Sequence, residues 1–271
     1  MNTQRDHKGT ISGQPTGVLP RVVTPHLLWT GGCLPLKYHD EWVHGHFSNY
    51  AVRGDGKSML IDTGHPAHWR SIESAVERFL EETPVDYIFI THGELPHAGL
   101  IAQWFEKYPD AIAFGDIREY PLYYPQYAHR FKVVKAGDSV DLGDRRIVFL
   151  PAVWRDLTTT LWAFDTTDRV LFVSDAYGYL HYHKRGECDL KTSEVPPPNA
   201  QMMRFLNERA LYWTVHADVS AAFEDLDEML RQLRPRYIAS AHGGVVDNSE
   251  AMAPLFKDGM MPTAPIFHQV R

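Results

Sequence analysis

The chain has 271 residues, of which 44% are hydrophobic, and its 27 Lys and Arg against 34 Asp and Glu give a net charge of 27 − 34 = −7. This balance argues against a nucleic-acid or anionic-membrane surface, because both need a concentration of positive charge. No stretch approaches the roughly 18 apolar residues of a membrane span, and the polar N-terminus lacks the apolar core of a signal peptide. We therefore expect a cytoplasmic globular protein that binds neither nucleic acid nor membrane.

Residues 1–22 are rich in Gly, Pro and polar residues without periodicity, which predicts a flexible N-terminal arm. A single domain is predicted over residues 23–271. Its β-rich runs and helical spacings follow one another in a regular order. The predicted elements are a strand at 26–32, a hairpin over 48–64 that turns at 54–57, a helix over 69–82, a strand at 87–93, a helix beginning near Pro96, strands at 112–116, 131–135, 147–152, 159–165 and 170–176, a helix over 218–233 and a last strand at 236–244.

Short strands around clear helices favour two sheets packed face to face with helices outside, an αββα sandwich of the α+β class. The charged and proline-rich segment 184–201 is predicted to be a surface loop or lid. Just before it, His181 and His183 alternate with tyrosines, which indicates one face of a strand or lid and only weakly a metal site. The two cysteines, Cys33 and Cys188, show no paired spacing and are predicted to be reduced thiols.

Polar clusters directly follow several predicted strands. They are 62-DTGH-65, 91-THGELPH-97, 174-SDAYG-178 and 240-SAHGG-244. In layered folds, strand ends along one edge converge on a cleft. The metal-ligating side chains of these clusters could therefore meet at one site, although they are far apart in the sequence. These candidate metal ligands are His92, Glu94, His97, Asp175 and His242, whose nitrogen and oxygen donors suit iron, manganese or zinc.

The spacing His92-x-Glu94-x-x-His97 differs from the metalloprotease motif HExxH, in which the two histidines are four residues apart on one helical face. Five residues correspond to about 140° around a helix, so both histidines can face one metal site only from a non-helical loop.

The pattern THGELPH after an apolar strand, with DTG upstream, resembles the metallo-β-lactamase superfamily. Glutamate at the centre of the loop is most similar to the diiron domain of flavodiiron proteins. The segments 171–178, 211–219 and 240–244 resemble, in order, those that supply the family's bridging aspartate, an aromatic stretch and the last histidine. The resemblance covers residues 26–250, and no flavodoxin-like segment is expected in the rest of the 271 residues.

The resemblance implies that His92 and Glu94 bind one iron, that His97 and His242 bind the other, and that Asp175 bridges them, with Glu94 and Asp175 as catalytic residues. Two family ligands are absent, because Pro96 and Val153 occupy their positions. One or two iron ions are therefore expected. Other side chains could complete the site: the candidates include Asp156, beside Val153, and His65, the best spare ligand because it directly follows the DTG turn.

Three functions remain open on the sequence. The first is a non-haem iron oxidoreductase that activates dioxygen or a small organic substrate. The second is a zinc- or manganese-dependent hydrolase of an ester, lactone or related bond, in which a metal-bound water attacks. The third is a non-catalytic sensor or binding protein on a degraded metal site.

The expected partner is a small molecule, and aromatic runs favour an aromatic or neutral one over a polyanion. Without a flavodoxin domain, electrons are expected from a separate reductase or from the substrate itself. Flavodiiron proteins typically form head-to-tail homodimers, so the resemblance admits a homodimer here.

Overall fold

Two β-sheets pack face to face in the computed structural model, which describes residues 11–38, 40–81, 83–181 and 186–260. One sheet has seven strands in the order β1-β2-β3-β4-β5-β6-β7, and the other has five in the order β12-β11-β10-β9-β8. The strands are β1 (Arg21–Thr24), β2 (Leu27–Tyr38), β3 (Glu41–Arg53), β4 (Ser58–Ile61), β5 (Tyr87–Phe89), β6 (Ile112–Gly115), β7 (Phe131–Val133), β8 (Ser139–Asp141), β9 (Arg146–Pro151), β10 (Leu161–Asp165), β11 (Val170–Phe172) and β12 (Tyr237–Ala239).

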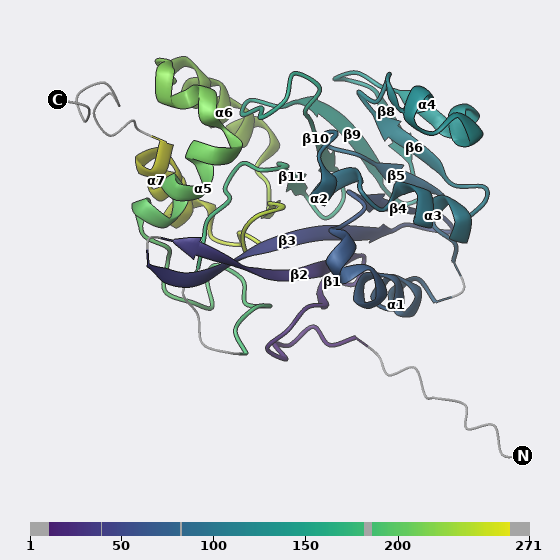
Figure 1. The fold of residues 1–271 in the computed structure, drawn as a ribbon, viewed down its shortest axis with the longest axis horizontal. Helices are drawn as coiled ribbons and strands as arrows, with labels where there is room; N and C mark the ends of the chain where they lie inside the picture. The colour runs from purple at the N-terminus through teal and green to yellow at the C-terminus, as the bar shows by residue number, and fades with distance from the viewer. Residues whose placement is uncertain (1–10, 39, 82, 182–185, 261–271) are drawn as a thin grey trace, which may run out of the picture.

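The helices gather in separate groups beside the sheets, with α1 and α3 in one group and α5, α6 and α7 in another (Figure 1). The α-helices are α1 (Trp69–Leu80), α2 (Leu95–Ala98), α3 (Ile101–Lys107), α4 (Tyr120–Tyr123), α5 (Ala200–Ala210), α6 (Ser220–Leu233) and α7 (Ser249–Met260), and the 3-10 helices are η1 (Pro66–His68), η2 (Pro125–Arg130) and η3 (Tyr212–His216). Within the described part of the chain, none of these helices has the length and apolar character needed to cross a membrane.

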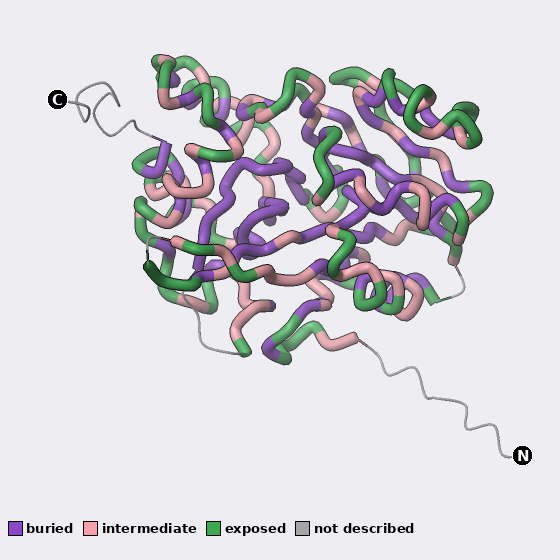
Figure 2. The backbone as a smooth tube through the Cα atoms, in the orientation of Figure 1, coloured by how far each residue is buried: buried purple, intermediate pink, exposed green. Residues whose placement is uncertain are grey.

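Three apolar clusters fill the spaces between the layers, and buried backbone runs through the middle of the molecule while exposed backbone lies at its periphery (Figure 2). One cluster joins the first sheet to α1 and α3 through residues such as Ile72 and Trp104. A second lies between the two sheets and contains Phe89 and Phe172. The third joins the second sheet to α5, α6 and α7, with Phe256 at its centre. This layering confirms the predicted αββα sandwich.

The helix predicted from Pro96 is interrupted after Ala98 and resumes at Ile101. Thr63 causes the interruption. Its backbone N–H donates to the carbonyl of His97 at 2.7 Å, and its Oγ1 accepts from the backbone N–H of Leu100 at 3.1 Å. Groups that would continue the helix are therefore bonded to the DTG turn, which ties the loop after β5 to the loop after β4.

The two longest helices that were not expected from the sequence are α5 and α7. The predicted loop 184–201 lacks helix and strand over residues 186–198, but α5 begins at Ala200, capped by the side chain of Asn199. In place of a short C-terminal tail, α7 extends to Met260 and buries Met252 and Phe256, which lie four residues apart on one face.

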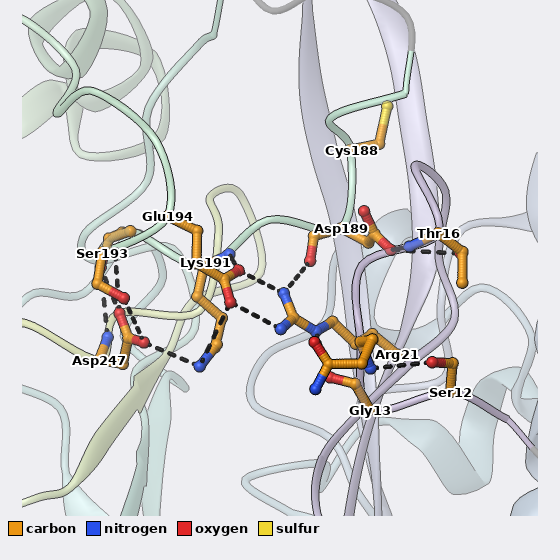
Figure 3. Close-up of polar contacts among 12 residues, drawn as sticks. Ser12, Gly13, Thr16, Arg21, Cys188, Asp189, Lys191, Ser193, Glu194 and Asp247 are labelled. Carbon is orange, nitrogen blue, oxygen red and sulfur yellow. Dashed lines mark hydrogen bonds and ion pairs between the residues drawn. The ribbon is translucent and has the colours of Figure 1, made fainter.

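Residues 11–22 were predicted to be part of a flexible arm, but the structure shows them in contact with the domain. Residues 1–10 of the predicted arm lie outside the described part of the chain. His183 also lies outside it. Arg21 belongs to β1 and its side chain is 4% exposed. Its guanidinium donates to Glu194 at 2.5 and 2.8 Å and to the carbonyl of Asp189 at 2.8 Å. Figure 3 shows this contact between the N-terminal segment and the loop that carries Asp189 and Glu194. The segment is therefore anchored to the domain from residue 11 onward.

Candidate metal centre

The carboxyl ends of several strands deliver polar side chains to one place. The parallel strands β4 and β5 end just before Asp62 and His92, and β11 and β12 end just before Asp175 and His242. Asp156 follows β9. Strand ends at one edge of two packed sheets therefore bring together residues that are distant in the sequence, as the sequence predicts for His92, His97, Asp175 and His242.

Asp175 lies at the centre of three histidines, and its two carboxylate oxygens face different partners. Oδ1 lies 3.1 Å from Nε2 of His97 and 3.2 Å from Nε2 of His242. Oδ2 lies 3.8 Å from Nε2 of His92. All four residues are buried, at 1–9% exposure. The cluster is thus enclosed, and Nε2 of each ring is the nitrogen directed toward the aspartate.

Each of the three rings is held through its other nitrogen. Nδ1 of His97 donates to Oδ2 of Asp62 at 2.8 Å, and Nδ1 of His242 donates to the carbonyl of His46 at 3.0 Å. Because a carboxylate and a carbonyl can only accept, Nδ1 of both rings carries a proton, and Nε2 is the nitrogen that a metal ion would take. Nδ1 of His92 lies 2.8 Å from Oγ of Ser174.

Two of these supporting residues have a backbone conformation that non-glycine residues rarely adopt. Asp62 has φ of 60° and Ser174 has φ of 53°. Asp62 is held by the backbone N–H of Thr91, at 2.8 Å from Oδ1, and by the hydroxyl of Thr91, at 3.0 Å from Oδ2. Such strain persists only where the surroundings impose it and is concentrated at functional sites.

A second group shares His92 with the first. The ligand atoms of His92, Glu94 and Asp156 lie within 4.8 Å of one another. Asp156 Oδ2 is 3.4 Å from Nε2 of His92. Glu94 is exposed and begins α2 as its N-cap. Asp156, which brings a carboxylate to this group, comes three residues after Val153.

The electrostatics of the cluster reflect its burial. Burial alone raises the pKa of Asp175, but His92, His97 and His242 outweigh it and hold that pKa well below its usual range. Burial and the neighbouring His97 lower the pKa of His92 to about 3. Burial, together with the charge of Asp175, raises the pKa of Asp156 to about 7. Burial alone lowers the pKa of His97, but the carboxylates of Asp62 and Asp175 outweigh it and raise that pKa well above its usual value.

These residues fit a metal ion. Nε2 of His92, Nε2 of His97 and Oδ1 of Asp175 are buried and have no hydrogen-bond partner among the described residues. Buried polar atoms are costly when they are left without partners. Convergent imidazole nitrogens and carboxylate oxygens are donors that iron, zinc and manganese accept.

His65 is placed differently from the five predicted ligands. Its Nδ1 accepts from the backbone N–H of Ala67 at 3.1 Å. The ring of Phe47 lies 5.1 Å from the ring of His65 and 5.2 Å from that of His242. Among the described residues, His65 therefore belongs to no group of close potential ligands.

A cavity of about 620 Å³ opens onto the cluster. Glu94, Asp156, Asp175 and His242 form its floor. Its walls come from the β2–β3 hairpin, α5 and η3, and its aromatic lining residues are Phe47, Phe205, Tyr212 and Trp213. Sequence reasoning did not predict α5, so Phe205 was missed, whereas Tyr212 and Trp213 lie in the aromatic segment 211–219 that the resemblance singled out.

Comparison with known proteins agrees with this architecture. A coenzyme F420H2 oxidase of Methanocaldococcus jannaschii is 28% identical over 233 residues, which cover 82% of this chain and 55% of that protein. An anaerobic nitric oxide reductase flavorubredoxin of Salmonella typhi is 31% identical over 143 residues, or 50% of this chain and 29% of that protein. The chain thus spans about half the length, or less, of these curated relatives.

Among solved structures, rubredoxin oxygen:oxidoreductase from Desulfovibrio gigas aligns with a TM-score of 0.65 at 17% identity, covering 89% of this chain and 61% of that chain. The fold is therefore shared with that protein. The profile of the metallo-beta-lactamase superfamily matches residues 45–183, which include β3 to β11 and His92, His97 and Asp175. The chain belongs to the metallo-beta-lactamase superfamily.

Proposed function

We propose that the chain is a non-haem iron oxidoreductase whose site resembles that of flavodiiron proteins. The observation that carries this proposal is that the two oxygens of the Asp175 carboxylate face different histidines. Oδ1 faces His97 and His242, and Oδ2 faces His92. A carboxylate in this arrangement can bridge two metal ions. The relatives named as F420H2 oxidase and nitric oxide reductase support a redox activity.

In this proposal, His92, Glu94 and Asp156 hold one iron, and Asp175 is its fourth protein ligand. These are the residues whose ligand atoms gather within 4.8 Å around His92, together with the aspartate facing it. In this proposal, Asp156 supplies the metal ligand that the apolar side chain of Val153 cannot supply. The first half of the centre therefore has a full set of imidazole and carboxylate donors.

The second iron has His97, His242 and Asp175 as its ligands. Pro96 offers no ligand atom beyond its backbone carbonyl, so this half keeps three protein ligands and open positions. A diiron centre supplies one-electron redox chemistry and binding positions for dioxygen, nitric oxide or a chelating substrate when bound. The chain's own contribution is to fix the ring orientations through Asp62, Ser174 and the His46 carbonyl.

The cavity supports a small substrate with aromatic or neutral character. Phe47, Phe205, Tyr212 and Trp213 line it, while Lys37 and Arg209 are its cationic lining residues. Aromatic walls exclude water and favour a flat apolar body. Electrons would come from a separate reductase or from the substrate. We also propose that the protein is cytoplasmic and forms a homodimer.

Metal analysis and a single-turnover assay test the proposal. Protein loaded anaerobically with iron(II) is expected to hold two irons per chain, with magnetic coupling between them in Mössbauer spectra, and to consume dioxygen or nitric oxide when reduced. Asp175→Ala should lose the coupling and the turnover, because both halves share that residue. Asp110→Ala, an exposed aspartate distant in the sequence from every proposed ligand, is the matched control.

Two results would overturn the proposal. One is a reduced, iron-loaded protein that consumes neither gas and oxidises no aromatic substrate. The other is a preparation that retains zinc or manganese and hydrolyses esters or lactones, which identifies the hydrolase alternative. A preparation that binds none of these metals would instead favour a non-catalytic sensor.

A further inference from the structure

A second group of metal-ligating side chains lies outside the proposed iron centre, on the β2–β3 hairpin. Cys33 on β2 pairs directly with His46 on β3, and Pro35 pairs with His44. Residues directly opposite one another share a face of the sheet, and alternate residues of one strand share that face too. The hairpin therefore presents Cys33, His44 and His46 side by side.

His181 joins this group from the segment after β11. Its backbone N–H donates to the carbonyl of His44 at 3.1 Å, which forms a bridge between the two segments. The His181 ring lies 4.4 Å from the ring of His44 and 4.3 Å from that of His46. Its Nε2 is 3.7 Å from Sγ of Cys33. His181 is 9% exposed and His46 is 3% exposed.

Cys188 approaches from a loop that the domain holds in place. Its backbone N–H donates to the carbonyl of Gly17 at 3.2 Å, and its carbonyl accepts from Nε2 of His46 at 2.7 Å. The next residue, Asp189, accepts from the backbone N–H of Gly17 at 3.0 Å. The Asp189 carbonyl accepts from the guanidinium of Arg21 (Figure 3). The position of Cys188 next to the hairpin is thus fixed from both sides.

Two groups of potential metal ligands share Cys33. The ligand atoms of Cys33, His44 and Cys188 all lie within 4.8 Å of one another, and so do those of Cys33, His46 and His181. The two cysteines do not form a disulfide. Two thiols with nearby imidazoles are the donor set of four-coordinate structural zinc. This differs from the carboxylate and imidazole set around Asp175, which suits harder metals.

We propose that Cys33, His44 and Cys188 hold a structural zinc ion, separate from the iron centre. The fourth ligand in this proposal is His181, whose Nε2 lies 3.7 Å from Sγ of Cys33 and whose ring lies beside that of His44. His46 supports it through the hydrogen bond to the Cys188 carbonyl. Zinc here would fasten the loop 186–198 to the β2–β3 hairpin. A cavity of about 220 Å³, lined by His46, His181 and Glu187, adjoins the group and offers an entry path.

Cobalt substitution and metal counting test this site without reference to enzyme activity. Purified protein is depleted of metal, titrated anaerobically with Co²⁺, and monitored for the thiolate-to-cobalt charge-transfer absorption that only a sulfur-ligated site produces. We expect this absorption in the unmodified chain and in His92→Ala, and expect Zn²⁺ to displace the cobalt. Cys33→Ser and Cys188→Ser should lose the absorption and one equivalent of zinc, while their iron content is retained.

His44→Ala keeps both thiols and should weaken cobalt binding, whereas His129→Ala, an exposed histidine elsewhere, should not. Because a cysteine variant can fail to fold, the unmodified chain is also tested by alkylation, which zinc should slow at Cys33 and Cys188.

The proposal is overturned if the charge-transfer absorption is absent from the unmodified chain. It is also overturned if zinc is lost in His92→Ala but kept in Cys33→Ser, or if non-reducing mass spectrometry finds a Cys33–Cys188 disulfide in freshly purified protein.

Discussion

Oδ2 of Asp62 accepts a hydrogen bond of 2.8 Å from Nδ1 of His97, and both side chains are buried. This contact fixes the tautomer of His97 and directs its Nε2 at Asp175. Asp62 also holds Thr91, the residue before His92. One carboxylate therefore orients both ends of the loop that carries the proposed ligands.

We predict that Asp62→Asn lowers metal affinity by about 10- to 100-fold, because outer-sphere partners of ligating histidines have effects of this size. The amide keeps the volume but loses the charge and one acceptor. Affinity is measured by competition with a chromophoric chelator. Asp110→Asn, at an exposed position, should bind metal as the unmodified chain does. Equal affinities for Asp62→Asn and the unmodified chain would show that His97 is not a ligand.

Asp156 provides a test of the first half of the centre. Its Oδ2 lies 3.4 Å from Nε2 of His92. Asp156→Ala should reduce iron from two ions per chain to one and remove the coupled spectroscopic signal. The double variant Val153→His with Asp156→Ala should recover part of the lost iron if, as the resemblance to flavodiiron proteins implies, a histidine at position 153 can reach the metal. Iron content that does not change in Asp156→Ala would exclude Asp156 as a ligand.

Local patterns are sufficient to predict much of this molecule. His92, Asp175 and His242 could be anticipated because each follows a short apolar strand, and strand ends converge in a layered fold. The hairpin turn at 54–57 and the face of α1 with Ile72, Val76 and Phe79 were similarly visible as turn residues and helical spacing.

Features that depend on contacts between distant segments could not be predicted in this way. The carbonyl of His46 supports His242 from a residue 196 positions away, and a carbonyl carries no sequence signal. The proximity of Cys33 to Cys188 depends on the contact between the loop 186–198 and the hairpin, where the Cys188 carbonyl accepts from His46. Helix α7 contains Pro254, which normally argues against a helix, so the apolar spacing of Met252 and Phe256 was not recognised.

Trp104 links the hydrophobic core to the site. It is fully buried, and its Nε1 donates to the carbonyl of Thr63 at 3.0 Å, one residue after Asp62. Trp104→Phe should lower the free energy of unfolding by about 2 kcal/mol, because it removes volume and leaves that carbonyl without its partner. Urea denaturation measures the change. Trp42→Phe, at a position that is 72% exposed, should change stability by less than about 0.5 kcal/mol, and a similar loss in both variants would contradict this account.

The Arg21–Glu194 pair should make stability depend on pH in the acid range. The hydrogen bond from Arg21 lowers the pKa of Glu194 below its ordinary value of 4.5, so the unfolded chain binds more protons than the folded one as the pH falls below that value. The contribution of the pair is therefore complete at neutral pH and is lost between pH 4.5 and the lower folded pKa. Glu194→Gln should be less stable by about 1 kcal/mol at neutral pH, after allowance for the partial exposure of Glu194. Thermal unfolding from pH 7 to pH 3 measures the difference in stability between Glu194→Gln and the unmodified chain. This difference should narrow below pH 4.5, whereas the difference for Glu119→Gln should not. A difference in stability that widens on acidification would contradict the assigned direction of the Glu194 pKa shift.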